Sequence, residues 1–236
     1  GWLGRGTGGG VWGGAGVRAV RARVICAESG CSAVAVTGSQ KGWMAPPGVA
    51  LVGVSDCAWA QQAKSRSPRF YFDWKEAKTW ADKGMTPFTP AIGVIFALQE
   101  GVGVLRGEGH GRGYGAHGRL GRGTQGGLEA LGFQLHARDG YRQDTVTSET
   151  THPGLDVNAL RKLLNDKYSV VIAGGQGKMT GKMIRVGHLG AIAAGDIVQV
   201  LWAIEQALEE LDIAPSDGRG VAAITASLQG VAAATR

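Results

Sequence analysis

Residues 37–48 of the chain read TGSQKGWMAPPG, a stretch rich in glycine and proline that carries one lysine, Lys41. Apolar runs at residues 33–37 and 49–54 flank it, and both are bounded by Gly, Pro or Ser, as fully buried strands are. The pattern predicts two strands joined by a loop that presents Lys41 at a sheet edge. A lysine there can form a Schiff base with a carbonyl compound, although a solvated loop lysine is the commoner case.

Helical and strand patterns alternate outward from this loop. Asp73 is placed to cap a helix that continues through Trp80, and apolar residues at helical spacing run from Ile92 to Leu105. This alternation continues to the C-terminal half, where it indicates α/β or α+β packing. The periodicities there predict strands at residues 133–137, 144–148, 169–173 and 183–186, and helices at 155–167 and 196–211.

Glycine is the unusual feature of the composition, with 41 copies in 236 residues. There is no triplet repeat and there are only 7 prolines, which excludes collagen. Glycine is densest at residues 107–127, where each interior glycine weakens a helix by about 0.5–1 kcal/mol relative to alanine. We therefore expect any helix there to be seriously weakened, and we expect the low-complexity residues after Pro215 to fray.

Composition and charge favour a soluble, near-neutral protein. Hydrophobic residues make up 44% and charged residues 19% of the chain, as in ordinary globular proteins. No run approaches the roughly 20 apolar residues that span a bilayer, so we expect a cytoplasmic protein with no membrane partner. The net charge is +6, but the first thirty residues hold four arginines against one glutamate. The remainder is close to neutral and gives little support for a nucleic-acid partner.

The segment around Lys41 closely resembles the cofactor-lysine segment of the class V aminotransferases, in the serine/alanine–glyoxylate (serine–pyruvate) branch. The resemblance covers about residues 34–212 and continues, in order, through TPFTPA at 86–91, GGQG at 174–177, GK at 181–182 and IRVGHLG at 184–190. It implies a fold-type I enzyme dependent on pyridoxal phosphate, of the α/β class. The expected architecture is an incomplete large α/β domain followed by a small C-terminal α+β domain.

The same resemblance implies how the chain is divided. Residues 32–105 would be the C-terminal part of the large cofactor-binding domain, residues 106–214 the small domain, and residues 215–236 a flexible tail. Residues 1–31 are Gly/Arg-rich, resemble no segment of the family, and read like a GC-rich gene translated in the wrong frame. We interpret the chain as a truncated, frame-shifted product that is genuine from about Val34.

The resemblance also implies roles for single residues. Lys41 would form a Schiff base with pyridoxal 5′-phosphate and then move a proton between the substrate α-carbon and the cofactor. Gln40 would contact the cofactor, and Arg185 would hold the substrate α-carboxylate through a bidentate fork. Thr89, with the nearby Thr86, would reach the cofactor phosphate from the partner subunit of a homodimer. Taken singly, the arginine could be an edge-strand charge and the threonines turn or capping residues. No metal site is expected.

The implied activity is amino transfer from a small amino acid, serine or alanine, to glyoxylate or pyruvate. The similar cysteine desulfurases carry His before the lysine and a later catalytic cysteine, whereas here Gln40 precedes Lys41 and no cysteine follows Cys57. The family's Asp that pairs with the pyridine nitrogen would fall near Ala15, yet no acidic residue precedes Glu28. A catalytically inactive fragment is therefore an alternative, and a Gly/Arg-rich nucleic-acid-binding protein is a less favoured third.

Overall fold

The computed structural model describes residues 34–150 and 152–229, and the chain divides into two compact units, residues 1–107 and 108–236. The Gly/Arg-rich segment singled out at residues 1–31 lies outside the described residues. Within them, no helix is long and apolar enough to cross a membrane. The cytoplasmic location stays a prediction from the sequence.

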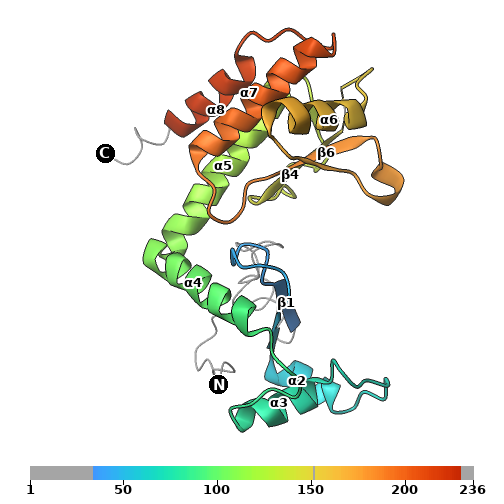
Figure 1. Ribbon diagram of the computed structural model, residues 1–236, viewed down its shortest axis with the longest axis vertical. Helices are drawn as coiled ribbons and strands as arrows, with labels where there is room; N and C mark the ends of the chain where they lie inside the picture. The colour runs from blue at the N-terminus through green and yellow to red at the C-terminus, as the bar shows by residue number, and fades with distance from the viewer. Residues whose placement is uncertain (1–33, 151, 230–236) are drawn as a thin grey trace. The chain divides into compact units, whose positions relative to one another are not determined.

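The described part of the first unit starts with a β-hairpin that carries the Lys41 loop (Figure 1). Strands β1 (Val34–Gly38) and β2 (Ala50–Val54) pair antiparallel, close to the expected ranges. The carboxylate of Asp73 caps the helix at Trp74–Asp82 as predicted, accepting a hydrogen bond of 2.8 Å from the Lys75 N–H. The helices described after the hairpin are α2 (Asp56–Gln62), α3 (Trp74–Asp82) and α4 (Ile92–Glu108).

One expectation for this unit is wrong, and one helix was missed. The flanking strands are not fully buried, since Val34 is 39% and Val36 61% exposed. The physical reason is that β1 and β2 pair only with each other among the described residues. The buried apolar side chains of the unit's described part are Trp43 and Ala45, both in the loop. Helix α2 was not anticipated, although Ser55 caps it by accepting a hydrogen bond from the Ala58 N–H at 3.2 Å.

The second unit is an antiparallel four-stranded sheet, in the order β3-β4-β6-β5, with helices packed on it (Figure 1). The strands are β3 (Gln134–Leu135), β4 (Val146–Thr150), β5 (Ala173–Gly174) and β6 (Met183–Gly187). The helices are α5 (His110–Ala130), α6 (Val157–Tyr168), α7 (Ala194–Glu210) and α8 (Arg219–Gln229).

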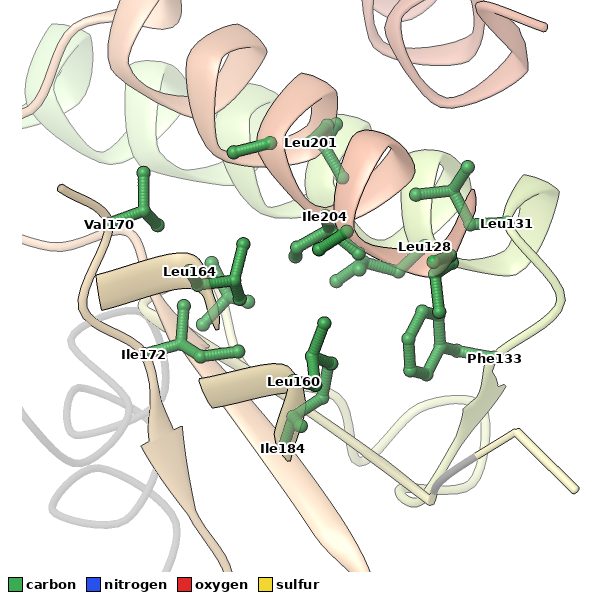
Figure 2. Packing of buried hydrophobic residues seen from close by; sticks show 14 of the residues in the cluster. Leu128, Leu131, Phe133, Leu160, Leu164, Val170, Ile172, Ile184, Leu201 and Ile204 are labelled. Carbon is green, nitrogen blue, oxygen red and sulfur yellow. The ribbon is translucent and has the colours of Figure 1, made fainter. Parts of the chain in front are cut away.

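A single hydrophobic core holds this unit together (Figure 2). Leu160 of α6 lies beside Ile184 of β6, Leu164 of α6 belongs to the same cluster, and Leu201 and Ile204 of α7 lie above them in the view. All five side chains are fully buried. Because burying one such side chain stabilises a fold by about 1.5–3 kcal/mol, this cluster dominates the stability of the unit.

The glycine-rich stretch, where we expected a seriously weakened helix, forms the continuous helix α5. Its glycines lie where α5 meets α7 and α8: a Cβ at Gly127 would come within 3.1 Å of Leu201 Cδ2. Two other predictions for this unit are wrong. The residues after Pro215 do not simply fray, since they contain α8, whose Ile224 is fully buried. The strand expected at 169–173 is reduced to β5, because Ser169 has a left-handed conformation (φ 54°) that ends α6.

Candidate functional site: the Lys41 loop and the Arg185 strand

Ser39 ties together the two ends of the loop between β1 and β2. Its N–H donates to the Val49 carbonyl at 2.9 Å, and its carbonyl accepts from the Ala45 N–H at 3.1 Å. Its hydroxyl donates to the Pro46 carbonyl at 2.6 Å and accepts from the Val49 N–H at 3.3 Å. The residue is fully buried. Every polar group of Ser39 is thus bonded to the returning half of the loop.

Lys41 lies at the tip of this loop with its side chain exposed. Its N–H donates to the Gly38 carbonyl at 3.1 Å, and its carbonyl accepts from the Met44 N–H at 3.0 Å. Met44 itself has φ 60°, a left-handed conformation that is uncommon for a residue other than glycine. The lysine backbone is therefore held on both sides while the primary amine stays accessible.

Trp43 anchors the loop to the rest of the first unit. Its ring is 8% exposed, and Nε1 donates to Thr37 Oγ1 at 3.1 Å. Helix α4 approaches the loop closely at Gly101, where a Cβ would overlap the Trp43 carbonyl oxygen. Glycine is therefore required at this contact.

The other residues expected at the cofactor lie on exposed backbone of the same unit. Gln40 is next to Lys41, and its side chain folds over Gly38, where a Cβ would come within 3.1 Å of the Gln40 Cδ. Thr86 Oγ1 donates to the Phe88 carbonyl at 2.8 Å, as in a turn, and Thr89 is exposed. Among the described residues no hydrogen bond joins Thr86 or Thr89 to the Lys41 loop.

Arg185 belongs to the second compact unit, on β6, where it pairs in register with Ser148 of β4 and Ala173 of β5. Its neighbours along the strand, Ile184 and Val186, point into the core, so Arg185 is on the opposite face of the sheet. Its Nε donates to the Gly174 carbonyl at 2.8 Å. The guanidinium is half-buried and has no ion pair with a described carboxylate.

His188, just after β6, holds the end of the Arg185 strand in place. It is fully buried; Nδ1 donates to the Asp144 carbonyl at 3.1 Å and Nε2 accepts from the Thr147 hydroxyl at 2.8 Å. Burial lowers the pKa of His188 to about 4, so the ring is neutral near pH 7. Sequence reasoning missed both His188 and Ser39 as supports of the site.

Glu149, on β4, is a fully buried carboxyl group for which no described atom serves as hydrogen-bond partner. Burial, followed by the negative charge of Glu129, raises its pKa to about 9. The residue faces the core beside Ile184, its register partner on β6. The Glu149 carboxyl is therefore protonated at neutral pH, so it places no negative charge next to β6.

The chemistry of these side chains fits a carbonyl cofactor and a carboxylate substrate. An accessible amine on a fixed loop can bond to an aldehyde, and a guanidinium with no ion-pair partner can bind a carboxylate. Lys41 and Arg185 are in different compact units. No group of three or more His, Cys, Asp or Glu that could hold a metal ion occurs in the described part of the chain.

The chain is similar to known proteins over most of its length. It is 37% identical over 180 residues to an uncharacterized aminotransferase of Methanocaldococcus jannaschii, covering 75% of this chain and 47% of that one. It is 35% identical over 188 residues to the soluble hydrogenase small subunit of a Synechococcus species, covering 79% and 49%. It is 32% identical over 193 residues to the serine–glyoxylate aminotransferase of Hyphomicrobium methylovorum, covering 80% and 48%.

The fold is found in a solved structure as well. The pyridoxamine–pyruvate aminotransferase of Mesorhizobium loti matches 84% of this chain and 52% of its own, with a TM-score of 0.76 and 29% identity. No protein-family model matches the chain. The chain spans about half the length of the curated relatives it matches. It belongs to the class V aminotransferase family, in its serine/alanine–glyoxylate branch, and has the fold-type I, mixed α/β architecture of these pyridoxal-phosphate enzymes over the half that it spans.

Proposed function

We propose that this chain carries the cofactor lysine and the carboxylate-binding arginine of a pyridoxal-phosphate-dependent aminotransferase. The amino donor would be serine or alanine, and the acceptor glyoxylate or pyruvate. The observation that carries this proposal is the position of Lys41, whose exposed amine stands on a loop with its backbone bonded on both sides, in a chain related to serine–glyoxylate aminotransferases.

Pyridoxal phosphate supplies the reactive carbonyl and the electron-withdrawing ring when it is bound. Lys41 would hold the cofactor through Nζ at that carbonyl carbon, with loss of water, and once released its amine would carry a proton to and from the substrate α-carbon. The Gln40 amide, one residue before the lysine, would contact the cofactor. Arg185 binds the substrate carboxylate through its two terminal nitrogens, because Nε is already occupied by the Gly174 carbonyl.

A homodimer is part of the proposal. Thr86 and Thr89 stand on the exposed segment between α3 and α4, where their hydroxyls are accessible. We assign them to the cofactor phosphate of the partner subunit. Equilibrium sedimentation of the chain with and without pyridoxal phosphate tests this assignment, because a dimer should be favoured by the cofactor.

Covalent labelling tests the role of Lys41. The full chain is mixed with pyridoxal phosphate, reduced with borohydride and mapped by peptide mass. We expect one dominant adduct, at Lys41, that disappears in Lys41→Ala and persists in Lys64→Ala, which removes an exposed lysine of the same unit. Labelling spread evenly over the lysines would refute the proposal.

A second candidate function, cofactor binding without turnover, is favoured by the absence of any acidic residue before Glu28. An Asp paired with the pyridine nitrogen makes the ring an effective electron sink, and losing such charge stabilisation slows reactions by orders of magnitude. An assay of the full chain with serine and glyoxylate separates the two candidates. A Lys41 adduct with no amino transfer would establish the second.

A further inference from the structure

The loop that carries Lys41 has a gap in its own backbone hydrogen bonding. Pro46 and Pro47 have no N–H, so neither residue can donate to the outgoing half of the loop. The backbone bonds across the loop are accordingly those that Ser39 makes to Ala45 and Val49, on either side of the two prolines. The donor missing at this place is supplied by a side chain, the Ser39 hydroxyl, which bonds the Pro46 carbonyl at 2.6 Å.

This hydroxyl is also the acceptor for the Val49 N–H, at 3.3 Å. The Ser39 hydroxyl therefore joins the start of β2 to the middle of the proline turn. Ser39 itself lies two residues before Lys41. The group is fully buried, so water cannot replace either bond. Removing the hydroxyl leaves the Pro46 carbonyl and one N–H without this partner, and the loop backbone gains freedom.

We propose that Ser39 is the positioning residue of the lysine, setting where the Lys41 amine stands when it meets the cofactor aldehyde. This inference rests on the proposed function of Lys41 as the cofactor lysine. The polar groups of Ser39 are all bonded within the loop. It acts through the Lys41 backbone, which follows it by two residues and is bonded to Gly38 and Met44.

The test compares Ser39→Ala with Ser55→Ala in the full chain. Both variants lose one serine hydroxyl in the same compact unit, but the Ser55 hydroxyl caps α2 by accepting from the Ala58 N–H and has no hydrogen bond to the loop among the described residues. After treatment with pyridoxal phosphate and borohydride, we expect the ratio of Lys41 adduct to adduct at the other lysines to be about tenfold lower in Ser39→Ala than in the unaltered chain. A tenfold change corresponds to the loss of about one hydrogen bond. Ser55→Ala should keep the labelling selectivity of the unaltered chain. If a general loss of stability controlled labelling, this variant would lose selectivity as well.

Amide hydrogen exchange gives a readout that is independent of the cofactor. The Val49 amide should exchange about tenfold faster in Ser39→Ala, because the Ser39 hydroxyl is its acceptor. If Ser39→Ala does not fold, exchange rates measured in the unaltered chain still test the inference. Val49 must then exchange more slowly than the Ser67 amide, which bonds a hydroxyl in an exposed turn, and equal rates overturn the inference.

The outcomes separate this inference from the function on which it rests. A selective Lys41 adduct that is equally strong in Ser39→Ala overturns the positioning role and leaves the proposed function standing. An adduct spread evenly over the lysines of the unaltered chain overturns both. A selective adduct that falls in Ser39→Ala and in Ser55→Ala alike shows that stability controls labelling and also overturns the positioning role.

Discussion

Two buried ionisable side chains of the second unit respond to pH in opposite directions. Glu149 has a folded pKa of about 9 against an ordinary 4.5, so the folded state holds a proton that the unfolded state has lost, and stability falls as pH rises through this window. His188 has a folded pKa of about 4 against an ordinary 6.5, so the unfolded state holds the extra proton, and stability falls as pH drops through that window.

The two effects should cancel where their windows overlap. Between about pH 4.5 and 6.5 the contributions of Glu149 and His188 are equal and opposite, and from about pH 6.5 to 9 only the glutamate remains. We predict that the free energy of unfolding falls over this upper range by up to about 1.4 kcal/mol per pH unit. Urea unfolding at a series of pH values, monitored by circular dichroism, measures this slope.

Glu149→Gln should remove the alkaline decline, because an amide does not titrate. Its stability should rise from about pH 4 to 6.5, with His188 alone in effect, and then stay level. Glu209→Gln, an exposed change on α7, is the matched control and should keep the decline of the unaltered chain. A decline that survives unchanged in Glu149→Gln would show that Glu149 does not cause it.

At the scale of elements, alanine substitution at two neighbouring glycines of α5 should change the stability of the chain in opposite directions. A Cβ at Gly126 meets nothing within 4 Å, whereas one at Gly127 would press on Leu201 and come within 3.2 Å of the Gly220 carbonyl oxygen. We predict that Gly126→Ala stabilises the chain by about 0.5–1 kcal/mol through helix propensity. Gly127→Ala should destabilise it by about 1–3 kcal/mol through overpacking. Thermal unfolding of the two variants distinguishes the signs, and equal effects would contradict the α5 packing.

Helix α4 offers a second pair of this kind. Gly101 lies against the backbone of Trp43, with 3.2 Å between a Cβ and the Trp43 carbonyl carbon, while a Cβ at Gly103 meets nothing within 4 Å. Because a backbone cannot yield as a flexible side chain does, Gly101→Ala should separate α4 from the Lys41 loop and cost about 1–3 kcal/mol. Gly103→Ala should be neutral or stabilising by about 0.5–1 kcal/mol. Hydrogen exchange of the Met44 and Ala45 amides, faster in the first variant alone, measures the separation.

The elements that the sequence predicted well are those with a local signal. Helices α3 and α6 begin where Asp73 and Asp156 cap them, and β6 coincides with the short apolar run after Lys182. Helix α5 was misjudged because propensity counts each glycine as a loss, whereas close approach of neighbouring helices offsets that loss. Such contacts join residues far apart in the chain, so a local pattern does not contain them.

At the candidate site too, the sequence revealed some residues and missed those whose role depends on tertiary contacts. The resemblance singled out Lys41, Gln40 and Arg185 by residue type, and their roles stay predictions. Ser39 and His188 escaped notice because their importance lies in buried hydrogen bonds to Pro46 and Asp144, which no spacing rule indicates. The two prolines after the lysine were the available signal for Ser39, since they remove backbone donors that something must replace.

At the scale of the whole molecule, stability is distributed unevenly between the two units. The described core cluster lies entirely between Leu120 and Ile224, in the second unit, while the buried apolar side chains in the described part of the first unit are Trp43 and Ala45. We predict that amides of α6, α7 and β6 exchange at least about a hundredfold more slowly than those of β1, β2 and α3. Hydrogen exchange with mass spectrometry of the full chain checks this, and equal protection in both units would contradict it.

The burial of Trp43 gives the Lys41 loop an optical property of its own. An indole that is 8% exposed and hydrogen-bonded to Thr37 emits at shorter wavelength than one in water, and the ring lies two residues from the reactive amine. In a chain whose other six tryptophans are replaced by phenylalanine, the emission would report only on this loop. Arrival of an aldehyde at Lys41, or opening of the loop, would then be followed as a change in the intensity and colour of the protein's own fluorescence.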